Sequence, residues 1–507
     1  MLLSSWLKRI SDRIRSRRYQ PDRKPKKPDR FTQLGLTRLE DRVVLTASAV
    51  FSGFNDLLVV DVDQEDVTIS TNGGRITVTG SVTGALGAFT AVNVQQIIVN
   101  DTNAGVGSGA VDFTTSNGSD FVLFKGVFVS ADIETAVINT GITATSNGNT
   151  VDINAGTLQL NADVIANAGS ILLAGDVVLG EGQNVTLSTG ATTGQIQIDG
   201  SLNGTGGGAS EALVITAGTG DVVLNNVGMA GADDLESLTV TSATSATISG
   251  AVDVNSSLTI TAGTASLNDD VSSGNLQIIT TANTTVTGTV NSSGTIDLDA
   301  ATFTQNGAIT AQDSVTIDVA NPLVLNQNLT SGGATTITVT ADDNGAVPFT
   351  LSSGVTLSSA SGMLTIQADD MNLSGTVAAA GQIVLLRQNS DGEVIELGGT
   401  GITDNELELA VAEIDSVTAS ILRIGHIAAG NINLTQEVSP ANSATLSLLS
   451  GGSVADIVAG GIGATNLAIQ ATGTVTLDNV RNVEALAASV TGAGSSFVFG
   501  NEDDGFV

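Results

Sequence analysis

The sequence predicts an all-β fold, a right-handed parallel β-helix with about 20 residues in each coil, a period that is typical of a solenoid. Short apolar segments recur at a nearly constant interval, and Leu238, Leu258, Leu276 and Ile296 begin successive segments. The 59 glycines and 3% aromatic residues suit an aliphatic core enclosed by tight corners. The length of 507 residues also fits, because a solenoid grows by adding coils.

Each coil is expected to hold three strands separated by corners. In the most regular stretch, residues 257–320, segments such as Leu258–Ile260 alternate apolar and polar residues, which places one side in the core and the other in water. A shorter strand centred on Leu267 follows, and a brief third segment completes the turn. The Asn, Asp, Gly and Ser residues between segments favour turn conformations. Stacking then stabilises coils that are unstable alone.

Low-complexity disorder is the alternative for a chain this rich in Gly, Ser, Thr and Asn. The chain contains 41% hydrophobic residues, and many of them lie in alternating segments. A disordered chain lacks such apolar content, so we expect ordered coils.

Four sections are expected: a leader with an export-type motif in residues 1–50, an N-terminal β section in 51–130, a regular solenoid in 131–400, and a further β section in 401–507. The second section is predicted to cap the stack, because the exposed end of a first coil must be covered. Seven of the 13 phenylalanines fall within it, as expected for a bulkier cap.

One short helix is predicted near residues 404–415, in the last section. Thr403 and Glu406 have the spacing of a capping box at a helix N-terminus. Apolar residues follow at Leu407, Leu409, Val411 and Ile414. The helix is expected to interrupt the solenoid before strands resume.

Charge is divided unevenly along the chain. Residues 1–42 carry 13 Lys+Arg and 5 Asp+Glu, while residues 43–507 carry the remaining 5 Lys+Arg and 46 Asp+Glu, for a net charge of −33. An acidic body repels phosphate backbones, which argues against nucleic acid as a partner. No run of eighteen apolar residues is present, so no transmembrane span is expected.

Residues 1–20 predict an amphipathic basic helix, with Leu3, Trp6, Leu7 and Ile10 at helical spacing between basic residues. Such a helix would contact an anionic membrane surface or the export machinery. A disordered basic tail is the alternative. The charged, proline-broken residues 21–30 then predict a linker.

A short motif follows, made by Leu39, Glu40, Asp41, Arg42 and Leu45. It resembles the Leu-Glu-x-Arg-x-x-Leu core of the N-terminal motif of planctomycete extracellular proteins, and the order of basic leader, motif and β-rich body is the same. The resemblance implies export and an extracellular or cell-surface location. A solvated helix end is the alternative, and an ordinary signal peptide would have a longer apolar region.

Leu422–Gly425, Ala429–Ile432 and Leu486–Gly494 carry a second likeness. They resemble the filamentous-haemagglutinin-type repeats of large bacterial surface proteins, which implies a β-helical surface or adhesive protein. The chain lacks the Asn-Pro-x-Gly secretion motif of the two-partner haemagglutinins, since Asn321-Pro322 is followed by other residues. The resemblance therefore does not extend to their secretion route.

Residues suited to catalysis are scarce. His426 is the single histidine and cysteine is absent, which excludes Cys-His dyads and two-histidine zinc sites. A β-helical polysaccharide lyase or hydrolase is the alternative, and it would need clustered carboxylates with basic or aromatic groups facing the sugar. Beyond residue 42 the basic residues are only Arg75, Lys125, Arg387, Arg423 and Arg481. We therefore predict that the protein is not an enzyme.

Acidic doublets recur near the predicted corners. Stacked corners would bring carboxylates of neighbouring coils together, where like charges repel and calcium would bridge them. Solvated turns without a metal are the alternative, and no other cofactor is expected. The candidate ligands are Asp269, Asp270, Asp342, Asp343, Asp369 and Asp370.

These features predict an exported, acidic β-solenoid with a structural or adhesive role at the cell surface. The expected partners are cell-surface or matrix components, such as polysaccharide or other surface proteins. Besides the enzyme, a stalk that displays other modules or belongs to a larger surface protein is an alternative.

Overall fold

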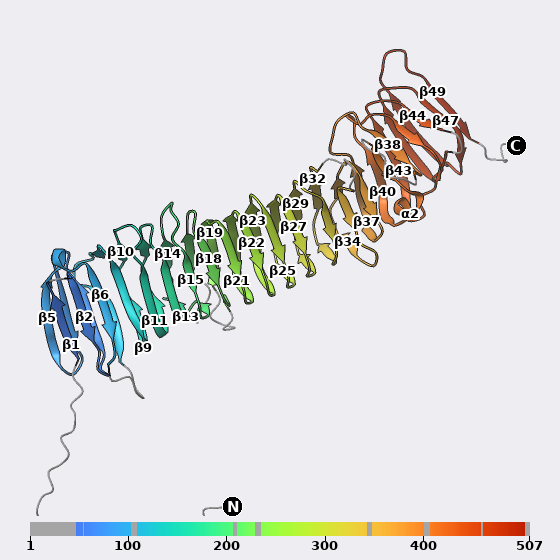
Figure 1. Cartoon of the computed structure of the whole chain (residues 1–507). Helices are drawn as coiled ribbons and strands as arrows, with labels where there is room; N and C mark the ends of the chain where they lie inside the picture. Colours follow the sequence, from blue (N-terminus) through green and yellow to red (C-terminus); the bar gives the residue numbers. More distant parts are fainter. Residues whose placement is uncertain are drawn as a thin grey trace, which may run out of the picture. The chain divides into compact units, whose positions relative to one another are not determined.

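The structure is a computed structural model that describes residues 47–53, 55–102, 109–205, 210–228, 235–341, 347–399, 406–457 and 460–501. These residues all belong to one compact unit, Leu45–Val507. The basic leader and the motif at Leu39–Leu45 lie outside the described residues. Coils of about 22 residues stack in parallel over about 17 turns, which confirms the predicted parallel β-solenoid (Figure 1).

The coils are on average slightly longer than the sequence period predicts, because corner loops vary in length. In the regular stretch Leu258 pairs with Leu276, whereas outside it Leu213 pairs with Leu238, which is a longer step along the chain. Insertions at corners do not disturb the ladder, because the strands on either side still meet in register.

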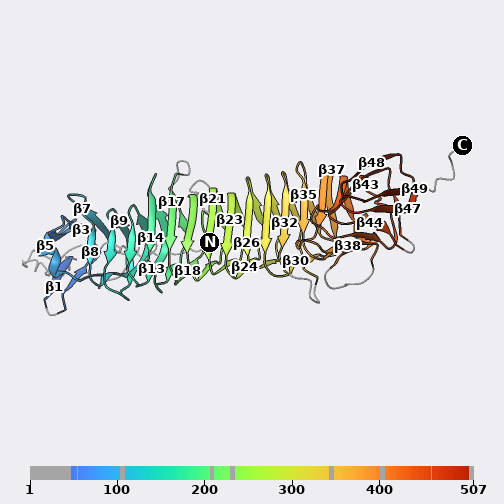
Figure 2. The same ribbon diagram turned by 90° about the horizontal axis from the view of Figure 1, so that it is seen from above.

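Each coil places one strand on each of three faces. β26 (Ile296–Ala300) lies on the first face, β27 (Thr302–Gln305) on the second and β28 (Ile309–Ala311) on the third, before β29 (Val315–Val319) returns to the first. Long strands such as β23 (Val271–Thr280) turn a corner and serve the third and first faces together. Figure 2 shows successive strands side by side along the stack.

Alternation along each strand sends every second side chain into the core. On the first face Leu238, Leu258 and Leu276 pair with one another and are at most 1% exposed. Thr259 lies between core positions and faces outward. This is the register predicted from the sequence.

A close approach of two backbones explains one of the glycines. Gly175 lies in β13 (Ile171–Leu179), where the strand passes from the second face to the third. Its φ is +96°, and a Cβ atom there would lie 1.7 Å from the carbonyl oxygen of Ala155 in the preceding coil. A side chain cannot fit, so this corner requires glycine.

Antiparallel strands cover the N-terminal end of the stack. β1 (Ser48–Ser52) pairs with β2 (Leu57–Asp61), and β4 (Arg75–Gly80) pairs with both β3 (Val67–Thr71) and β5 (Gly84–Thr90). β2 and β3 then begin the parallel ladders, with β6 (Gln96–Asn100) and β7 (Ala110–Thr115) as their partners. The core residues Leu58, Val60 and Ile69 are 0% exposed as a result.

The stacking changes after β37 (Thr376–Arg387). On the first face β37 pairs with β40 (Val417–Gly425), so that ladder is continuous. On the second face the ladder ends at β36 (Met371–Leu373), and a separate eight-stranded sheet begins with β39 (Glu406–Leu409) and β38 (Val394–Leu397). The short helix α2 (Val411–Asp415) follows β39.

The predicted helix near residues 404–415 is therefore wrong in its first part. Glu-Leu-Glu-Leu at Glu406–Leu409 alternates with period two and pairs in register with Val394–Leu397 as a strand. The helix also does not begin at the capping box predicted from Thr403 and Glu406, since Glu406 lies in the strand. Thr403 itself lies outside the described residues. The N-cap is Ala410, whose N–H donates to Glu413 Oε2 at 2.8 Å.

The last coils continue both faces. β43 (Ser443–Ser450), β46 (Asn466–Ala471) and β48 (Ala485–Val490) extend the first face. β41 (Ile432–Leu434), β44 (Val454–Asp456), β47 (Val475–Arg481) and β49 (Phe497–Asn501) extend the second. Among the described residues, no helix has both the length and the apolar character needed to cross a membrane.

Candidate functional site

The predicted corner carboxylates lie in two different environments. Asp270 is exposed and accepts hydrogen bonds from the Thr289 N–H and Oγ1, both at 2.8 Å. These bonds from the next coil lower the pKa of Asp270. Asp269 is exposed as well, and its Oδ1 accepts the Asp270 N–H at 2.9 Å. This doublet therefore closes a turn and ties two coils together.

The second doublet is buried. Asp369 is 1% exposed and accepts the Asn389 N–H at 2.7 Å, the Ser390 N–H at 2.6 Å and the Ser390 Oγ at 2.8 Å. Asp370 is 4% exposed, and its Oδ1 accepts the Met371 N–H at 2.8 Å. Asp369 thus fixes a corner of the following coil. The remaining candidates, Asp342 and Asp343, lie outside the described residues.

A buried carboxylate, Asp370, and a half-buried one, Glu413, join the two sheets of the second face where their backbone ladder is interrupted. Asp370 accepts the backbone N–H of Glu408 in β39. Glu413 in α2 accepts the Leu373 N–H of β36 through Oε1 at 2.9 Å, and the Ala410 N–H through Oε2. Side-chain oxygens thereby take the place of ladder carbonyls, because a buried N–H needs an acceptor. We call Asp370, Glu396, Glu406, Glu408 and Glu413 the acidic junction.

Burial of several carboxylates together shifts their proton affinities. Burial raises the pKa of Asp370 to about 7, and the charges of Glu413 and Glu408 contribute to the rise, although the hydrogen bonds from Met371 and Glu408 oppose it. Burial and the charge of Glu408 likewise raise the pKa of Glu413. Asp370 and Glu413 therefore keep their protons to a higher pH than exposed carboxyl groups do.

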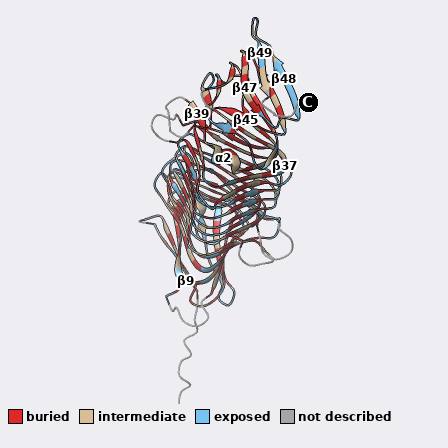
Figure 3. Ribbon diagram, turned by 90° about the vertical axis from the view of Figure 1, so that its right-hand side faces the viewer, coloured by how far each residue is buried: buried red, intermediate tan, exposed pale blue. Residues whose placement is uncertain are grey.

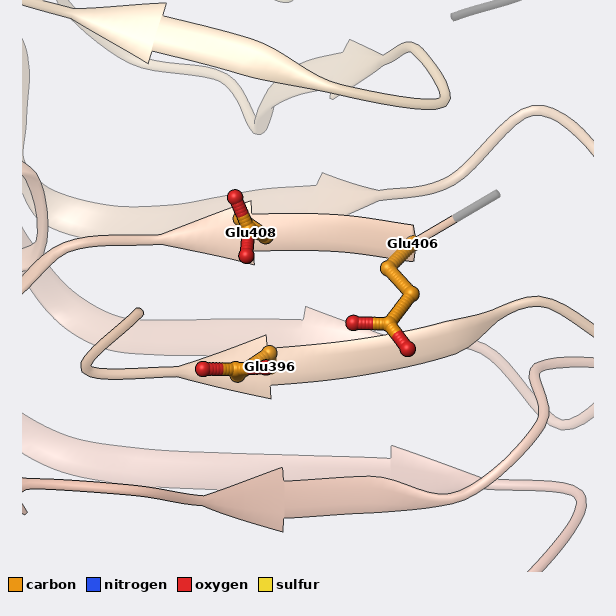
Figure 4. A group of neighbouring side chains, drawn as sticks. All are labelled: Glu396, Glu406 and Glu408. Atoms are coloured by element: carbon orange, nitrogen blue, oxygen red, sulfur yellow. The ribbon is translucent and has the colours of Figure 1, made fainter. Parts of the chain in front are cut away.

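Three glutamates of the junction project from neighbouring strands on one side of the sheet. Glu406 and Glu408 lie in β39, and Glu396 lies in β38 directly opposite Glu408 (Figure 4). One carboxylate oxygen of each lies within 4.8 Å of the others. The Thr435 Oγ1 donates to Glu396 Oε1 at 3.1 Å. Burial, followed by the charges of Glu396 and Glu408, raises the pKa of Glu406.

This arrangement has the chemistry of a hard-cation site. Carboxylate oxygens are the ligands that calcium prefers, and three glutamates offer up to six of them. Within the described ranges, Glu396, Glu406 and Glu408 are the one group of three acidic or histidine side chains close enough to share an ion. A glycine also lies over them: a Cβ atom at Gly399 would be 3.1 Å from Glu396 Oε1 and 3.3 Å from Glu408 Oε1.

The sequence interpretation missed this trio for a specific reason. The spacing from Thr403 to Glu406 predicts a helix cap, and neither Glu396 nor Glu408 belongs to an acidic doublet. The available signal was the alternation of Glu and Leu at Glu406–Leu409, which predicts two glutamates on one side of a strand. Nothing local in the sequence indicates that Glu396 pairs opposite Glu408.

Replacing Glu406 by glutamine tests the junction electrostatics. In EDTA, Glu406→Gln is expected to raise the urea midpoint, by roughly 0.5 kcal/mol in unfolding free energy, because a neutral amide removes repulsion from Glu396 and Glu408. In calcium the gain should disappear, since the variant loses a ligand. The exposed Glu437→Gln, which loses a 3.6 Å ion pair with Arg481, serves as the control. If the wild type has the same urea midpoint in EDTA and in calcium, calcium binding by these three glutamates is ruled out.

Arg387 and His426 have local hydrogen-bond partners away from the trio, and Arg423 lines a separate hollow. The Arg387 guanidinium donates to Gln367 Oε1 through Nε at 3.0 Å and through Nη2. Arg423 lines a hollow of about 350 Å³ together with Ser447, Ala468 and other small or uncharged residues. His426 Nδ1 accepts the Ala428 N–H at 3.1 Å and so closes a turn. These contacts give neither arginine nor the histidine a role at the trio.

In the comparisons with known proteins, no family model, no curated protein and no solved structure matches this chain. The fold itself defines the class. The chain is a parallel β-solenoid with an acidic junction between two sections of its second face.

Proposed function

We propose that this protein is exported and serves at the cell surface as a structural or adhesive β-solenoid. The basic leader and the export-type motif at Leu39–Leu45 support export, through the resemblance described above. The acidic body would repel nucleic acid, so the proposed role does not involve binding it. The protein is proposed to act by its shape and surface, without catalysis.

The observation that carries the proposal is the continuity of the first-face ladder. From β26 through β29, β37, β40, β43 and β46 to β48, each coil is hydrogen-bonded to the next through the junction and the helix insertion. Such nearest-neighbour stacking produces a stiff scaffold rather than a hinged pair of domains. A scaffold of this kind suits a structural or display role.

A polar trough on the third face supports the adhesive part of the proposal. Asp253, Ser272, Asn291 and Thr310 pair in register from coil to coil and line a hollow of about 310 Å³ with Gln312 and neighbouring serines. Their spacing is that of adjacent strands, about 4.8 Å. Hydroxyl and amide groups repeated in this way can hydrogen-bond to the hydroxyls of an extended polysaccharide.

The acidic junction favours one alternative, a carbohydrate-active enzyme. Paired carboxylates about 5 Å apart, one with a raised pKa, are the groups that glycoside hydrolysis uses. The described hollows are lined by none of the three glutamates. Asp370 is buried and engaged by backbone N–H groups. The junction therefore fits a structural or cation-binding role better than catalysis. The other alternative, a passive stalk, requires no binding at the trough.

Localising the native protein tests the proposal. Intact cells are treated with protease, the protein is followed by antibody, and the N-terminus of the mature chain is sequenced. We expect digestion at the surface and a mature chain that begins after the motif at Leu39–Leu45. A protected cytosolic protein that begins at Met1 would overturn the export proposal. Release of soluble sugars by the purified protein from surface polysaccharide would instead support the enzyme.

A further inference from the structure

Six neighbouring strands of the first face present an outer surface with a distinctive charge pattern. In stacking order they are β26, β29, β32 (Thr335–Val339), β35 (Leu364–Gln367), β37 and β40. Every second residue of these strands points away from the core, and Figure 3 shows by colour how buried and more accessible residues alternate along the stacked strands. We call the outward residues of these six strands the six-coil surface.

Two rows of outward residues run along the six-coil surface, because residues that pair in register stack above one another. The first row begins at Asp297 in β26 and ends at Arg423 in β40. The residues between them are uncharged: Thr316, Thr336, Thr365 and Leu385. The second row runs from Asp299 and Asp318 to Arg387, through Thr338 and Gln367. Acidic groups therefore lie at one end of the surface and basic groups at the other.

These five charged side chains are available to a partner. Within the described part of the chain, none of them forms an ion pair. Asp299 and Asp318 are exposed and line a hollow of about 470 Å³. The buried Nε of Arg423 has no hydrogen-bond partner among the described residues. Three acidic and two basic groups also make this surface nearly neutral, whereas residues 43–507 as a whole carry 46 acidic and 5 basic residues. Repulsion from a second acidic body is therefore weak here.

Apolar side chains accompany the two arginines on the outer side of the sheet. Ile383, Leu385 and Ile421 are partly exposed, at positions where β26, β29 and β32 carry small or polar residues. Met363, next to the buried Leu364, is 42% exposed. Arginine and methionine are enriched at protein interfaces, and grouped apolar side chains on a surface mark contact with another protein. These residues favour a protein partner over a hydrated sugar chain.

We propose that a second copy of this chain covers the six-coil surface, with the two stacks antiparallel. A two-fold axis that runs parallel to the strands, between β32 and β35, reverses the order of the coils and sets each row against the same row of the second copy. Asp297 then lies opposite Arg423 of the second copy, and Asp318 lies opposite Arg387 of the second copy. The symmetry repeats both pairs, so four pairs of opposite charge form.

Charge selects this alignment over others. In a parallel alignment each coil faces its own counterpart, so Asp297 meets Asp297 and Arg423 meets Arg423 of the second copy. Like charges placed opposite each other oppose such a contact. A slip along the stack moves the aspartates away from the arginines. Beyond residue 42 the other basic residues are only Arg75, Lys125 and Arg481. The six-coil surface is thus complementary to itself in one arrangement.

The size of the contact sets its expected strength. Six strands about 4.8 Å apart, each with outward residues over a length of about 16 Å, cover roughly 450 Å² on each copy. Interfaces of this size lie at the low end of specific contacts. We therefore expect a dissociation constant in the micromolar range.

Sedimentation velocity of the full-length protein measures this dimer. The wild type is expected to pass from monomer to dimer between about 1 and 300 μM. Arg423→Glu sets a glutamate opposite Asp297 at both symmetry-related contacts, and should raise the dissociation constant about tenfold or more. Asp297→Lys should do the same. The double variant, Asp297→Lys with Arg423→Glu, should restore the dimer, because opposite charges face each other again.

Arg481→Glu is the matched control, since it makes the same change in charge on the second face and should leave the dimer intact. Circular dichroism of each variant confirms that it folds. A wild type that stays monomeric at about 300 μM would overturn the proposal. A double variant that dimerises no better than either single variant would do so as well. So would a monomer that binds polygalacturonate through Arg387 and Arg423, because an anionic polysaccharide would then be the occupant.

Cross-linking tests the alignment independently, because the chain contains no cysteine. Thr336 lies beside the two-fold axis, so a short bis-maleimide should link Thr336→Cys to its counterpart and give a species of double mass. Thr259 lies on the same outer row, joined to Asp297 through Gln277. The axis places Thr259 about 40 Å from its counterpart, so Thr259→Cys should not be linked. Equal cross-linking at the two positions would contradict the antiparallel dimer.

Discussion

Replacing Leu258 by aspartate is expected to lower the free energy of unfolding by about 4 kcal/mol or more. Leu258 is 0% exposed and lies between Leu238 and Leu276 in the core row of the first face. An aspartate there either buries a charge without a partner or binds a proton at a large cost. Urea unfolding followed by circular dichroism measures the loss.

The neighbouring residue provides a matched control for this substitution. Thr259 faces outward, between Thr239 and Gln277 on adjacent strands, and none of these is charged. Thr259→Asp should therefore change the unfolding free energy by only about 0.5 kcal/mol. Equal effects at the two positions would contradict the register of the stack, because a shift of one residue exchanges the two sides of the strand.

The second large effect concerns pH and Asp370. The pKa of this carboxyl is 3.8 as a reference and about 7 in the folded chain, mainly because of burial. Well below pH 3.8 it is protonated in both states, and its preference for the folded state is fully present. As the pH rises toward 7, the unfolded chain ionises first and that contribution is lost, up to about 4 kcal/mol for a shift of this size. Stability should therefore fall between pH 5 and pH 7.5.

Carboxylates elsewhere in the chain limit how much stability the protein gains as the pH is lowered. In Glu65 and Glu211 burial alone would raise the pKa, but several hydrogen bonds together outweigh it and lower the pKa. Hydrogen bonds from Ser201 lower the pKa of Asp176. The stability that these groups contribute is present above their ordinary pKa values of 4.5, 4.5 and 3.8 and is lost as the pH falls below them. The two opposing trends place the optimum near pH 5.

Asp370→Asn separates these contributions. A neutral amide has nothing to ionise and keeps one oxygen to accept an N–H, so the variant should be more stable than the wild type at pH 7.5 by roughly 1–3 kcal/mol. Its urea midpoint should also change less between pH 5 and pH 7.5. Asp270→Asn is the control, since hydrogen bonds from Thr289 lower the pKa of Asp270 and it stays ionised throughout this range. If the urea midpoint of Asp370→Asn changes with pH as much as that of the wild type, Asp370 is not the source of the pH dependence.

The repeat is broken at two places in the described part of the chain, the acidic junction and the last described coil. At the junction, carboxylates replace a missing backbone ladder, and three of them form a group able to hold a cation. At the last described coil, the core rows reach solvent. The regular coils between them provide the scaffold against which both exceptions can be recognised.

The sequence by itself determined the stack and its register, because both depend on local patterns. Alternation as in Leu258–Ile260 decides which side chains enter the core, and the recurrence of that pattern decides that coils pair in parallel. The tertiary structure alone decided the acidic junction and the exposure of the last described coil. Glu396 and Glu408 meet because two strands pair across a loop, Asp370 and Glu413 reach backbone groups in another sheet, and Leu486 is exposed because no described strand follows it in the stack. Such contacts depend on distance in space, which a local pattern does not encode.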